Sequence, residues 1–493
     1  MDLTDIVPSA FIPKPLTVVV VGTGVSGIQF AHDVTASLKD VDLQIFDRNP
    51  CLGGTWYLNN YPGCTCDVPS HTYQFSWAPN PLWSSLYPPA REIHQYLEDV
   101  VDKHNLRRFM TFNTECVSAN WDEKSSKWEI VFRNVQSTFE RTIWADIFVY
   151  AVGRLNNYKV PRIPGQDKFQ GKQVHTANWP SRMNVKKKRV IVIGNGASSV
   201  QCTAALQPVV SKVINIARGP TWIVPHVFSD DGAVQRHYSS EQKNALQLSP
   251  PKYYDFRIGL EKKLAAGFPG LWKGTRSQAR FTSLSESFMK SKIADQKLLD
   301  ALLPDFEAGC RRFTPGGPYL DALQQPNAEY LRDSISELTS EGLITSSGRN
   351  IECDIIVYAT GFEPYQPRFP VIGRAGQSLS KAWDREGPCE SYMAAMVAGF
   401  PNFFDKNANG KIIVPWPGTV LHYYAATEII RWEDFDLEYE NPAEKYASFG
   451  NGVTADGFVP DRFPWVIPPL QQKHPISLSS GSPEKPLLVQ GRI

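Results

Sequence analysis

One pattern occurs twice in this chain of 493 residues and restricts the folds that it can adopt. Residues 17–30 read TVVVVGTGVSGIQF, and residues 189–201 read RVIVIGNGASSVQ. In each stretch a β-branched run, typical of a buried strand, ends in Gly-x-Gly and passes into a helical pattern. A strand, a tight glycine turn and a helix in that order are typical of the unit that binds a dinucleotide. The repetition predicts an α/β fold with two Rossmann-like dinucleotide-binding domains.

The first copy has the complete Gly-x-Gly-x-x-Gly pattern, at Gly22, Gly24 and Gly27. Gly22 allows the tight turn, Gly24 the close approach of a diphosphate, and Gly27 close packing of the helix on the strand. The next strand, LQIF, ends at Asp47, whose carboxylate can hydrogen-bond the ribose hydroxyls of an adenosine. The alternative is an ordinary structural turn, and the flanking strand, helix and acid favour the dinucleotide site.

The second copy differs at two points. The residues of its turn and helix start are Gly194, Gly196, Ala197, Ser198 and Ser199, so that a serine replaces the third glycine. The strand that follows, KVINIA, ends at Arg218 and has no acid in the ribose position. A guanidinium suits the 2′-phosphate of NADP, whereas the alternative is a solvated surface arginine. An adenosine-diol site followed by a 2′-phosphate site predicts FAD and NADPH as the cofactors.

Two further apolar strands end in Ala-x-Gly, DIFVYAVG at Gly153 and DIIVYATGF at 354–362. We expect the second of them to return the chain to the first domain, so that the NADP domain is inserted into the FAD domain. The expected division is 1–160 for the first part of the FAD domain, 161–345 for the NADP domain with a helical insertion at 229–305, and 346–493 for the rest of the FAD domain with a polar tail. A tryptophan-containing strand pair is expected near 116–133.

Composition excludes several classes of protein. Lys and Arg number 51 against 50 Asp and Glu, and this net charge of +1 favours neither nucleic acid nor an anionic membrane as a partner. No apolar run is long enough to cross a bilayer, and the acidic, proline-broken N-terminus is unlike a secretory signal. Eight scattered cysteines without a C-x-x-C indicate reduced thiols, a cytoplasmic location and no metal site.

The stretch FQGKQVHTANWP, residues 169–180, lies between the two Gly-x-Gly motifs. It resembles the F-x-G-x-x-x-H-x-x-x-W-P fingerprint of Baeyer–Villiger monooxygenases, flavoenzymes of class B that use FAD and NADPH. The defining positions are occupied by Phe169, Gly171, His175, Trp179 and Pro180. A glycine, a histidine that can bond backbone and a stiff Trp-Pro also suit a segment that joins two domains that move during the cycle. We interpret His175 as structural or conformational.

The resemblance also implies roles in two other segments. CLGGTWYLNNYPGCTCDVPSHTYQFSW, residues 51–77, resembles the flavin-covering segment of the family, which implies FAD contacts for Gly54, Thr55, Trp56 and Tyr73 and a place for Asp67 between flavin and nicotinamide. GCRRFTPGGPYLDAL, residues 309–323, resembles the segment that carries the catalytic arginine, in a form seen in fungal members. This implies Arg312 as the catalytic residue, oriented by Asp67, and Arg311 beside the NADP phosphate. Without the resemblance, the two arginines would be a solvated pair at a helix end.

The implied reaction inserts one oxygen atom of O₂ next to a ketone carbonyl, giving an ester or lactone. The fungal form of 309–323 implies secondary metabolism and a polyketide-type substrate, and the expected pathway is of the aflatoxin or sterigmatocystin kind. A heteroatom-oxidising flavin monooxygenase is one alternative, although its fingerprint lacks the Trp-Pro ending. After GFPNFF, residues 399–404, a block usual in the family is absent, through a lost exon or a reshaped pocket. A flavin-binding protein without turnover is therefore the other alternative.

Overall fold

The computed structural model describes residues 15–225, 237–267, 270, 273–309, 313–383 and 395–405. Apart from Phe75–Pro79, these residues belong to one compact unit. Arg311 and Arg312, the two arginines that the family resemblance singles out, lie outside the described residues, as does the whole chain beyond residue 405.

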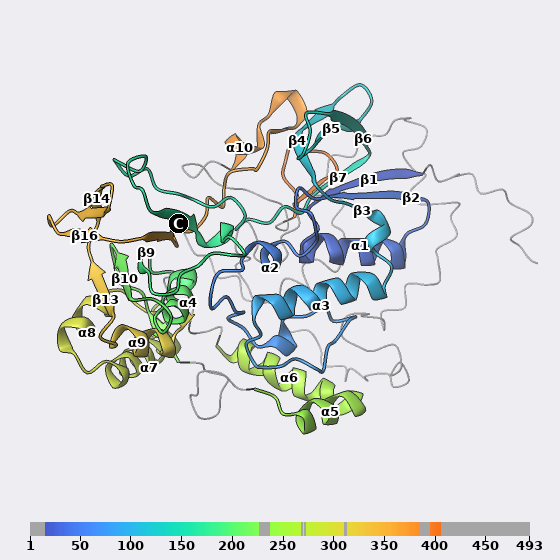
Figure 1. Cartoon of the computed structure of the whole chain (residues 1–493). Coiled ribbons are helices and arrows are strands. Elements are labelled where there is room, and N and C mark those ends of the chain that lie inside the picture. Colours follow the sequence, from blue (N-terminus) through green and yellow to red (C-terminus); the bar gives the residue numbers. More distant parts are fainter. Residues whose placement is uncertain are drawn as a thin grey trace, which may run out of the picture. The chain divides into compact units, whose positions relative to one another are not determined.

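The first sheet is parallel and has the Gly-x-Gly strand at its centre (Figure 1). Its strand order is β19 (Phe403–Asp405), β7 (Ile147–Tyr150), β1 (Leu16–Val21), β2 (Val41–Phe46) and β3 (Met110–Thr111). Val18 of β1 is in register with Leu43 on one side and Ile147 on the other. The run of four buried valines that ends β1 is the pattern of a strand covered on both faces.

The second sheet repeats this arrangement. Its order is β13 (Ala328–Arg332), β10 (Lys212–Ala217), β9 (Arg189–Ile193), β17 (Ile355–Tyr358) and β8 (Lys172–His175), all parallel. In both sheets the Gly-x-Gly strand has the following strand of its unit on one side and an Ala-x-Gly strand on the other. The two Rossmann-like units expected from the repeated motif are therefore present.

One expectation about the domain organisation is wrong. The strand within 354–362 does not return the chain to the first sheet, because β17 pairs with β9 and β8 in the second. The second domain therefore extends at least to Tyr358 rather than ending at 345. The return to the first sheet comes at β19, which pairs with β7. A short buried run such as IIVY fits a central strand of either sheet, so its burial pattern carries no information on which sheet it joins.

Two further sheets are built mainly from antiparallel pairs. The expected tryptophan-containing pair is β4 (Thr114–Asp122) and β5 (Lys127–Asn134), with Trp121 opposite Trp128, and it is extended by β6 (Glu140–Ala145) and by β18 (Val371–Ile372), which joins β4 in parallel. This sheet shares a core of buried side chains, Trp128 among them, with the first parallel sheet. The smaller sheet of β14 (Ile335–Leu338), β15 (Gly342–Thr345) and β16 (Asn350–Glu352) precedes β17. β11 (Ile223–Val224) pairs with β12 (Thr314–Pro315).

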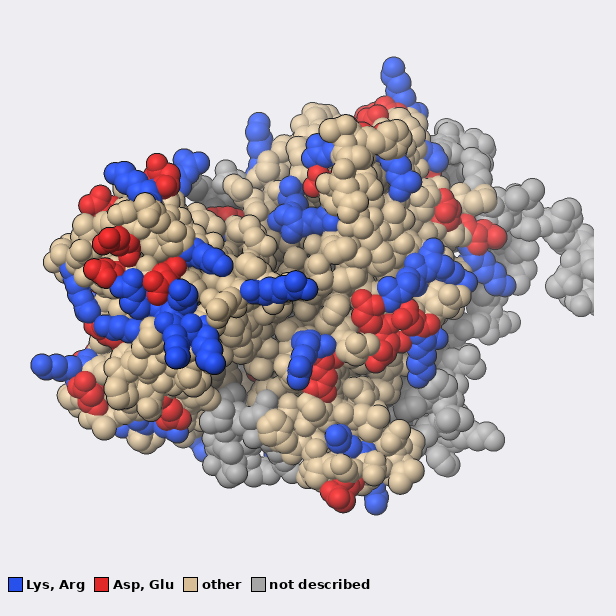
Figure 2. Space-filling view, viewed as in Figure 1, with Lys and Arg blue, Asp and Glu red and all other residues tan. Residues whose placement is uncertain are grey.

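Helices follow the glycine turns and form the insertion. Those of the first domain are α1 (Val25–Ser37), α2 (Thr55–Leu58), α3 (Ala90–Lys103) and α10 (Leu379–Ala382), and those of the second are α4 (Ala197–Leu206) and α9 (Gly317–Leu323). Within the described part of 229–305 lie α5 (Ser240–Leu248), α6 (Pro250–Ala266), α7 (Arg276–Lys292) and α8 (Gln296–Leu302), in line with the expected helical insertion (Figure 1). On the face shown in Figure 2 both signs of charge are interspersed, as the net charge of +1 leads one to expect.

Candidate active site

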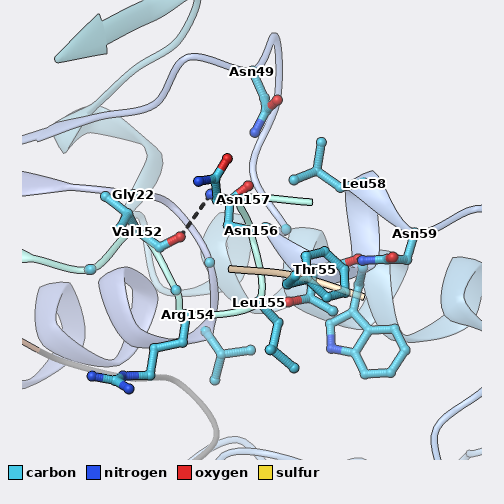
Figure 3. Close-up of a pocket in the computed structure, with 18 of the residues that line it drawn as sticks. Gly22, Asn49, Thr55, Leu58, Asn59, Val152, Arg154, Leu155, Asn156 and Asn157 are labelled. Atoms are coloured by element: carbon cyan, nitrogen blue, oxygen red, sulfur yellow. Dashed lines mark hydrogen bonds between the residues drawn. The ribbon is translucent and has the colours of Figure 1, made fainter. Parts of the chain in front are cut away.

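A cavity of about 900 Å³ opens at the carboxyl ends of β1, β2 and β7 (Figure 3). Its wall is formed by the segments that follow those strands, together with 53–59, 64–68 and the start of α4. The carboxyl edge of a parallel sheet is where this class of fold binds its ligands. Of the residues singled out in the sequence, the wall contains Gly22, Gly24, Asp47, Gly54, Thr55, Trp56, Asp67, Tyr73, Ala197 and Ser198.

The tight turns at the two Gly-x-Gly strands have the same geometry. Gly22 has φ +115° and Gly194 has φ +121°, a region that favours glycine. A Cβ atom at Gly22 would lie 2.3 Å from the carbonyl oxygen of Ala151, and one at Gly194 would lie 2.4 Å from that of Ala359. Each turn is thus pressed against the residue that ends the neighbouring Ala-x-Gly strand, which explains why the two motifs occur together.

The helices that start at these turns have free N-termini. Neither α1 nor α4 has a side-chain cap, since Gly24 and Gly196 stand in the N-cap positions. Other helices, such as α3 and α6, also lack a side-chain cap, but α1 and α4 are the ones that begin at the two Gly-x-Gly turns. Uncapped amides at a helix N-terminus, with the helix dipole behind them, attract phosphate. The two turns therefore fit the diphosphates of two dinucleotides.

The acid expected to contact ribose is already fully engaged. Oδ2 of Asp47 accepts bonds from the amide of Thr23 at 2.8 Å and its hydroxyl at 2.7 Å, and Oδ1 accepts from the amide and side chain of Asn49, both at 2.9 Å. A carboxylate has about four acceptor positions. A ribose hydroxyl would therefore take the place of one of these bonds, and the Asn49 side chain, which points along the cavity wall (Figure 3), is the partner that can leave.

The flavin-covering segment holds two aromatic residues together. Nε1 of Trp56 donates to the hydroxyl of Tyr73 at 3.2 Å, and the two rings meet edge to face at 5.4 Å. Thr55 and Asp67 are exposed on the wall. Next to Tyr73, the buried His71 has Nδ1 3.0 Å from the hydroxyl of Tyr253 in α6. Burial lowers the pKa of His71 to about 4, so that this histidine is neutral near pH 7.

The same segment connects the cavity to the second domain. The hydroxyl of Tyr61 donates to Oε1 of Gln201 at 2.8 Å, and Nε2 of Gln201 donates to Thr65 at 3.2 Å. A Cβ atom at Gly63 would lie 2.6 Å from the carbonyl oxygen of Gln201. This close contact brings the start of α4, Ala197 and Ser198, into the wall of the first-domain cavity.

The rest of the second motif lies outside the cavity wall. Ser199 is buried and its hydroxyl donates to the carbonyl oxygen of Gly194 at 2.6 Å, so the serine fills the place of the third glycine with a hydrogen bond. Gly27, its counterpart, has no such room, because a Cβ atom there would lie 2.0 Å from the carbonyl oxygen of Gly22. Arg218 is exposed directly after β10, at the carboxyl edge of the second sheet.

The fingerprint stretch forms β8, at the edge of the second sheet, and the turn after it. Phe169 is buried, Trp179 packs on a core cluster, and Gly171 leaves no room for a Cβ atom, which would lie 2.6 Å from the carbonyl oxygen of Asp354. The buried ring of His175 accepts a bond from the amide of Ala177 at 3.0 Å. Pro180 accepts a bond from the amide of Met183 through its carbonyl.

His175 touches both segments that connect the two domains. Its ring stacks on Tyr158 at 4.7 Å and meets Phe362 edge to face at 5.9 Å. Phe362 also lines the cavity, and it is bridged to Tyr158 in an antiparallel pair. Burial lowers the pKa of His175 to about 4. A neutral histidine without contact to the cavity agrees with its interpretation as a structural residue.

Sequence reasoning missed several residues of the cavity wall. These are Arg48, Asn49, Arg154, Asn156, Asn157, Tyr365 and Arg368. Arg48 donates to Oδ1 of Asn156 at 3.1 Å, and the side chain of Asn156 donates to the carbonyl oxygen of Val152 at 2.8 Å (Figure 3). The signal available for the five residues up to Asn157 was their position shortly after β2 and β7, whose carboxyl ends flank that of β1. Tyr365 and Arg368 follow neither of these strands.

One set of potential metal ligands occurs in the part of the chain that the structure describes. Donor atoms of Cys51, His94 and Glu98 lie within 4.8 Å of one another. Nε2 of His94 is 2.9 Å from the carbonyl oxygen of Leu52, and Glu98 pairs with Arg107. Burial raises the pKa of the Cys51 thiol to about 11, which disfavours the thiolate that binds metals. These side chains are accounted for by protein partners.

Across the described ranges, no helix is both long and apolar enough to cross a membrane. Residues 16–253 match the profile of a family described as flavin-binding monooxygenase-like. The chain is 36% identical over 402 residues to the FAD-binding monooxygenase tazF of Aspergillus terreus, an alignment that covers 80% of this chain and 71% of that one. It is 35% identical over 395 residues to a Baeyer–Villiger monooxygenase of Streptomyces coelicolor, which covers 78% and 72% of the two chains.

A third relative has a longer alignment. The FAD-binding monooxygenase moxY of Dothistroma septosporum is 33% identical over 521 positions, covering 90% of this chain and 82% of its own. Among solved structures, cyclohexanone monooxygenase of Rhodococcus sp. Phi1 bound to NADP+ superposes with a TM-score of 0.68 at 28% identity, over 80% of each chain. The OTEMO complex with FAD and NADP superposes with a TM-score of 0.69 at 25% identity, over 80% of this chain and 82% of that one.

Proposed function

The chain belongs to the Baeyer–Villiger and flavin-binding monooxygenase family, whose members use FAD and NADPH, and we propose that it inserts one oxygen atom of O₂ next to the carbonyl of a ketone. The product is an ester or a lactone. The observation that supports this most directly is the composition of the 900 Å³ cavity, whose wall combines the first Gly-x-Gly turn with the start of α4 from the second unit. A flavin and a nicotinamide held by these two elements can meet in one space.

The separate roles of the cofactor and the protein follow from that arrangement. When bound, FAD supplies hydride acceptance from NADPH and the activation of O₂. The protein supplies the positions of the two dinucleotides, the exclusion of water and a fixed positive charge near the reacting oxygen. We assign the charge to Arg312, because a guanidinium stays protonated at any physiological pH and can stabilise an oxyanion. Asp67 orients this arginine, and Arg311 together with Arg218 binds the phosphate of NADPH.

The boundaries of the domains are part of the proposal. We infer that the FAD domain is interrupted by the NADP domain, which begins near 161 and ends after Tyr358. The fingerprint stretch then lies inside the second domain, next to the two segments that connect it to the first. Its contacts through Tyr158 and Phe362 support a role in transmitting domain movement to the cavity wall.

The substrate class is inferred from the relatives. FAD-binding monooxygenases of fungi, tazF and moxY, align over 71% and 82% of their own lengths. Together with the fungal form of residues 309–323, this supports a ketone of polyketide type in secondary metabolism, of the aflatoxin or sterigmatocystin kind.

The reaction class can be tested with matched substrates. Purified protein loaded with FAD receives NADPH and either a ketone or the thioether of the same carbon skeleton. We expect ester formation from the ketone in step with NADPH consumption, and little sulfoxide from the thioether. Faster turnover of the thioether, with no ester, would support the heteroatom-oxidising alternative. Flavin that binds but is not reduced by NADPH would support a binding protein without turnover.

Arg312→Ala tests the assigned charge in the same assay. Loss of one such stabilising group costs about 3 kcal/mol or more, or several hundredfold in rate. The variant should stay yellow and oxidise NADPH but release hydrogen peroxide instead of ester. Arg311→Ala is the matched control, and it should raise the KM for NADPH while ester and NADPH remain coupled. Ester formation by Arg312→Ala at the wild-type rate would refute the assignment.

A further inference from the structure

Arg154 follows β7, directly after Gly153, and lines the cavity. Its Nε and Nη2 atoms are shielded from solvent and, among the residues that the structure describes, have no hydrogen-bond acceptor. In Figure 3 its guanidinium turns away from the asparagine side chains of the wall, Asn49 and Asn156. Leaving a buried donor unsatisfied costs about 1–3 kcal/mol, and more when the group is charged. An acceptor from outside the chain would remove that cost.

Two aromatic rings hold the guanidinium in place. Its Cζ atom lies 5.5 Å from the ring centre of Tyr365 and 5.6 Å from that of Trp383. Such cation–π contacts fix the position of the charge but leave the in-plane N–H groups free to donate. The indole Nε1 of Trp383 is buried and also has no acceptor within the described ranges. Three donor atoms from two adjacent side chains are thus available.

A small annex of the main cavity lies beside these donors. It has a volume of about 20 Å³, shares Val152, Arg154 and Arg368 with the main cavity wall, and is also lined by Trp383. Among the residues that the structure describes, its lining contains two arginines and no carboxylate. Arg368 is held by a bond of 3.2 Å from its Nη1 to the carbonyl oxygen of Asn156. Two positive charges without a negative one select for an anionic ligand group.

The carboxylates on the main cavity wall are engaged elsewhere or not paired with Arg154. Asp47 accepts four bonds from Thr23 and Asn49, and Glu115 pairs with Arg133 at 2.6 Å. The diphosphate of FAD has its own place at the uncapped start of α1. Among the described residues of the wall this leaves Asp67, which is exposed and forms no ion pair with Arg154, so that an oxyanion of the substrate is the candidate considered next.

We propose that Arg154, with Trp383, recognises an oxyanion of the substrate, a carboxylate or an acidic phenolate, whose ketone lies in the main cavity. This inference rests on the proposed function and specifies its substrate class. The annex admits one oxygen-sized group, so the anionic oxygen enters it while the rest of the molecule stays in the larger space. Arg154 is a specificity-determining residue, since it acts on a part of the substrate away from the reacting carbonyl.

Ligand binding can be measured without turnover, and this tests the proposal separately from the proposed reaction. The oxidised holoenzyme, without NADPH, is titrated with benzoylpropionate and with its methyl ester, which carries the same ketone without the charge, and the flavin absorption spectrum reports binding. We expect the wild type to bind the acid more tightly. In Arg154→Gln the acid should bind about 10-fold to 100-fold more weakly, whereas the ester should bind as before. Arg154→Lys should keep part of the preference, because the charge remains without the planar fork.

Control variants test whether Arg154 donates to the substrate or to another acceptor, a bound water or the cofactor phosphate. Arg162→Gln, at an exposed position that lines neither cavity, should leave both affinities unchanged. Trp383→Phe keeps an aromatic ring at this position but removes the indole N–H. It should weaken binding of the acid and leave binding of the ester unchanged. If the ratio of the affinity for the acid to the affinity for the ester were unchanged in Arg154→Gln and Arg154→Lys, the proposal would be overturned, and a bound water would be the only acceptor. Weaker retention of FAD by Arg154→Gln, with an unchanged affinity ratio in the fraction that still holds flavin, would overturn the proposal and make the cofactor phosphate the partner.

Discussion

The carboxylate of Asp47 illustrates how a cofactor-site residue first stabilises its own loop. Its four bonds tie Thr23, next to the first glycine turn, to Asn49, after the second strand. The acid therefore fixes the relative positions of two walls of the cavity, and ribose competes with Asn49 for one oxygen. At the second site the equivalent position carries Arg218, which is exposed and follows β10 directly. The exchange of acid for guanidinium underlies the expected difference in cofactor.

The Arg218 assignment predicts a change in cofactor preference. In Arg218→Ala the KM for NADPH should rise by about tenfold or more, because a charge-assisted contact to the 2′-phosphate is worth about 1.5–3 kcal/mol. The KM for NADH, which lacks this phosphate, should remain unchanged and serves as the internal control. Rates of flavin reduction measured over a range of each cofactor check this. An equal rise in the KM for NADPH and for NADH would show that Arg218 stabilises the fold and does not bind the 2′-phosphate.

At the scale of elements, the two β–α turns differ in how closely strand and helix pack. A Cβ atom at Gly27 would lie 2.0 Å from a carbonyl oxygen, whereas Ser199 occupies the same place in the second turn with a hydrogen bond. The hydroxyl of Ser199 also accepts a bond from the buried Asn215 at 3.0 Å, and Asn215 in turn accepts one from Tyr319 at 2.6 Å. The second turn therefore has hydrogen bonds at the position where the first has Gly27, which carries no side chain.

This difference yields a matched pair of variants. Gly27→Ala should displace α1 from β1, at a cost of about 1–3 kcal/mol for overpacking, and the purified protein should hold less FAD. Ser199→Ala adds no atom and should lower stability by only about 1 kcal/mol through the lost hydrogen bond. Flavin absorbance per protein and thermal unfolding measure the two effects. Full flavin content in Gly27→Ala would contradict the close packing.

The elements also show what the sequence could predict. The glycine turns, the strands before them, the helical insertion and the strand pair near 116–133 follow local patterns, and these were predictable. The sheet that β17 joins could not be predicted, because IIVY is buried on all sides and suits either sheet. Arg154 and Arg368 were missed for a similar reason, because each has a contact more than 200 positions away in the sequence, Arg154 with Trp383 and Arg368 with Asn156.

For the molecule as a whole, buried neutral histidines link the segments around the cavity. His71 packs on Tyr253 of the helical insertion, and His175 packs between the two segments that connect the domains. Burial lowers the pKa of each to about 4, from an ordinary value of 6.5. Below pH 6.5 the unfolded chain takes up protons at these positions and the folded chain does not. Stability is therefore unaffected by these groups above pH 6.5 and falls as the pH decreases toward 4.

The expected size of this effect is about 2 kcal/mol per histidine at pH 5 relative to pH 7.5. Thermal unfolding at the two pH values should show a lower Tm at pH 5. His71→Gln should reduce the difference between the two values, whatever its effect on the Tm at pH 7.5. A difference in His71→Gln as large as in the wild type would mean that other groups cause the pH dependence.

The length of the chain bears on the shape of the substrate site. The alignment with moxY of Dothistroma septosporum extends over 521 positions but takes in 90% of these 493 residues, so that the relative has residues without a counterpart here. The family resemblance predicts that these residues include a block after Phe404. The transcript across codons 395–415 distinguishes a lost exon from a pocket that is open by nature.

The central claim is the transfer of one oxygen atom from O₂ to a ketone, and it can be measured directly. Purified protein with FAD, NADPH and a polyketide-type ketone is incubated under ¹⁸O₂, and the product is analysed by mass spectrometry. We predict an ester or lactone that contains one ¹⁸O atom per molecule, formed in proportion to the NADPH consumed. NADPH consumption that yields only hydrogen peroxide across a range of ketones, or an ester without ¹⁸O, would contradict the account.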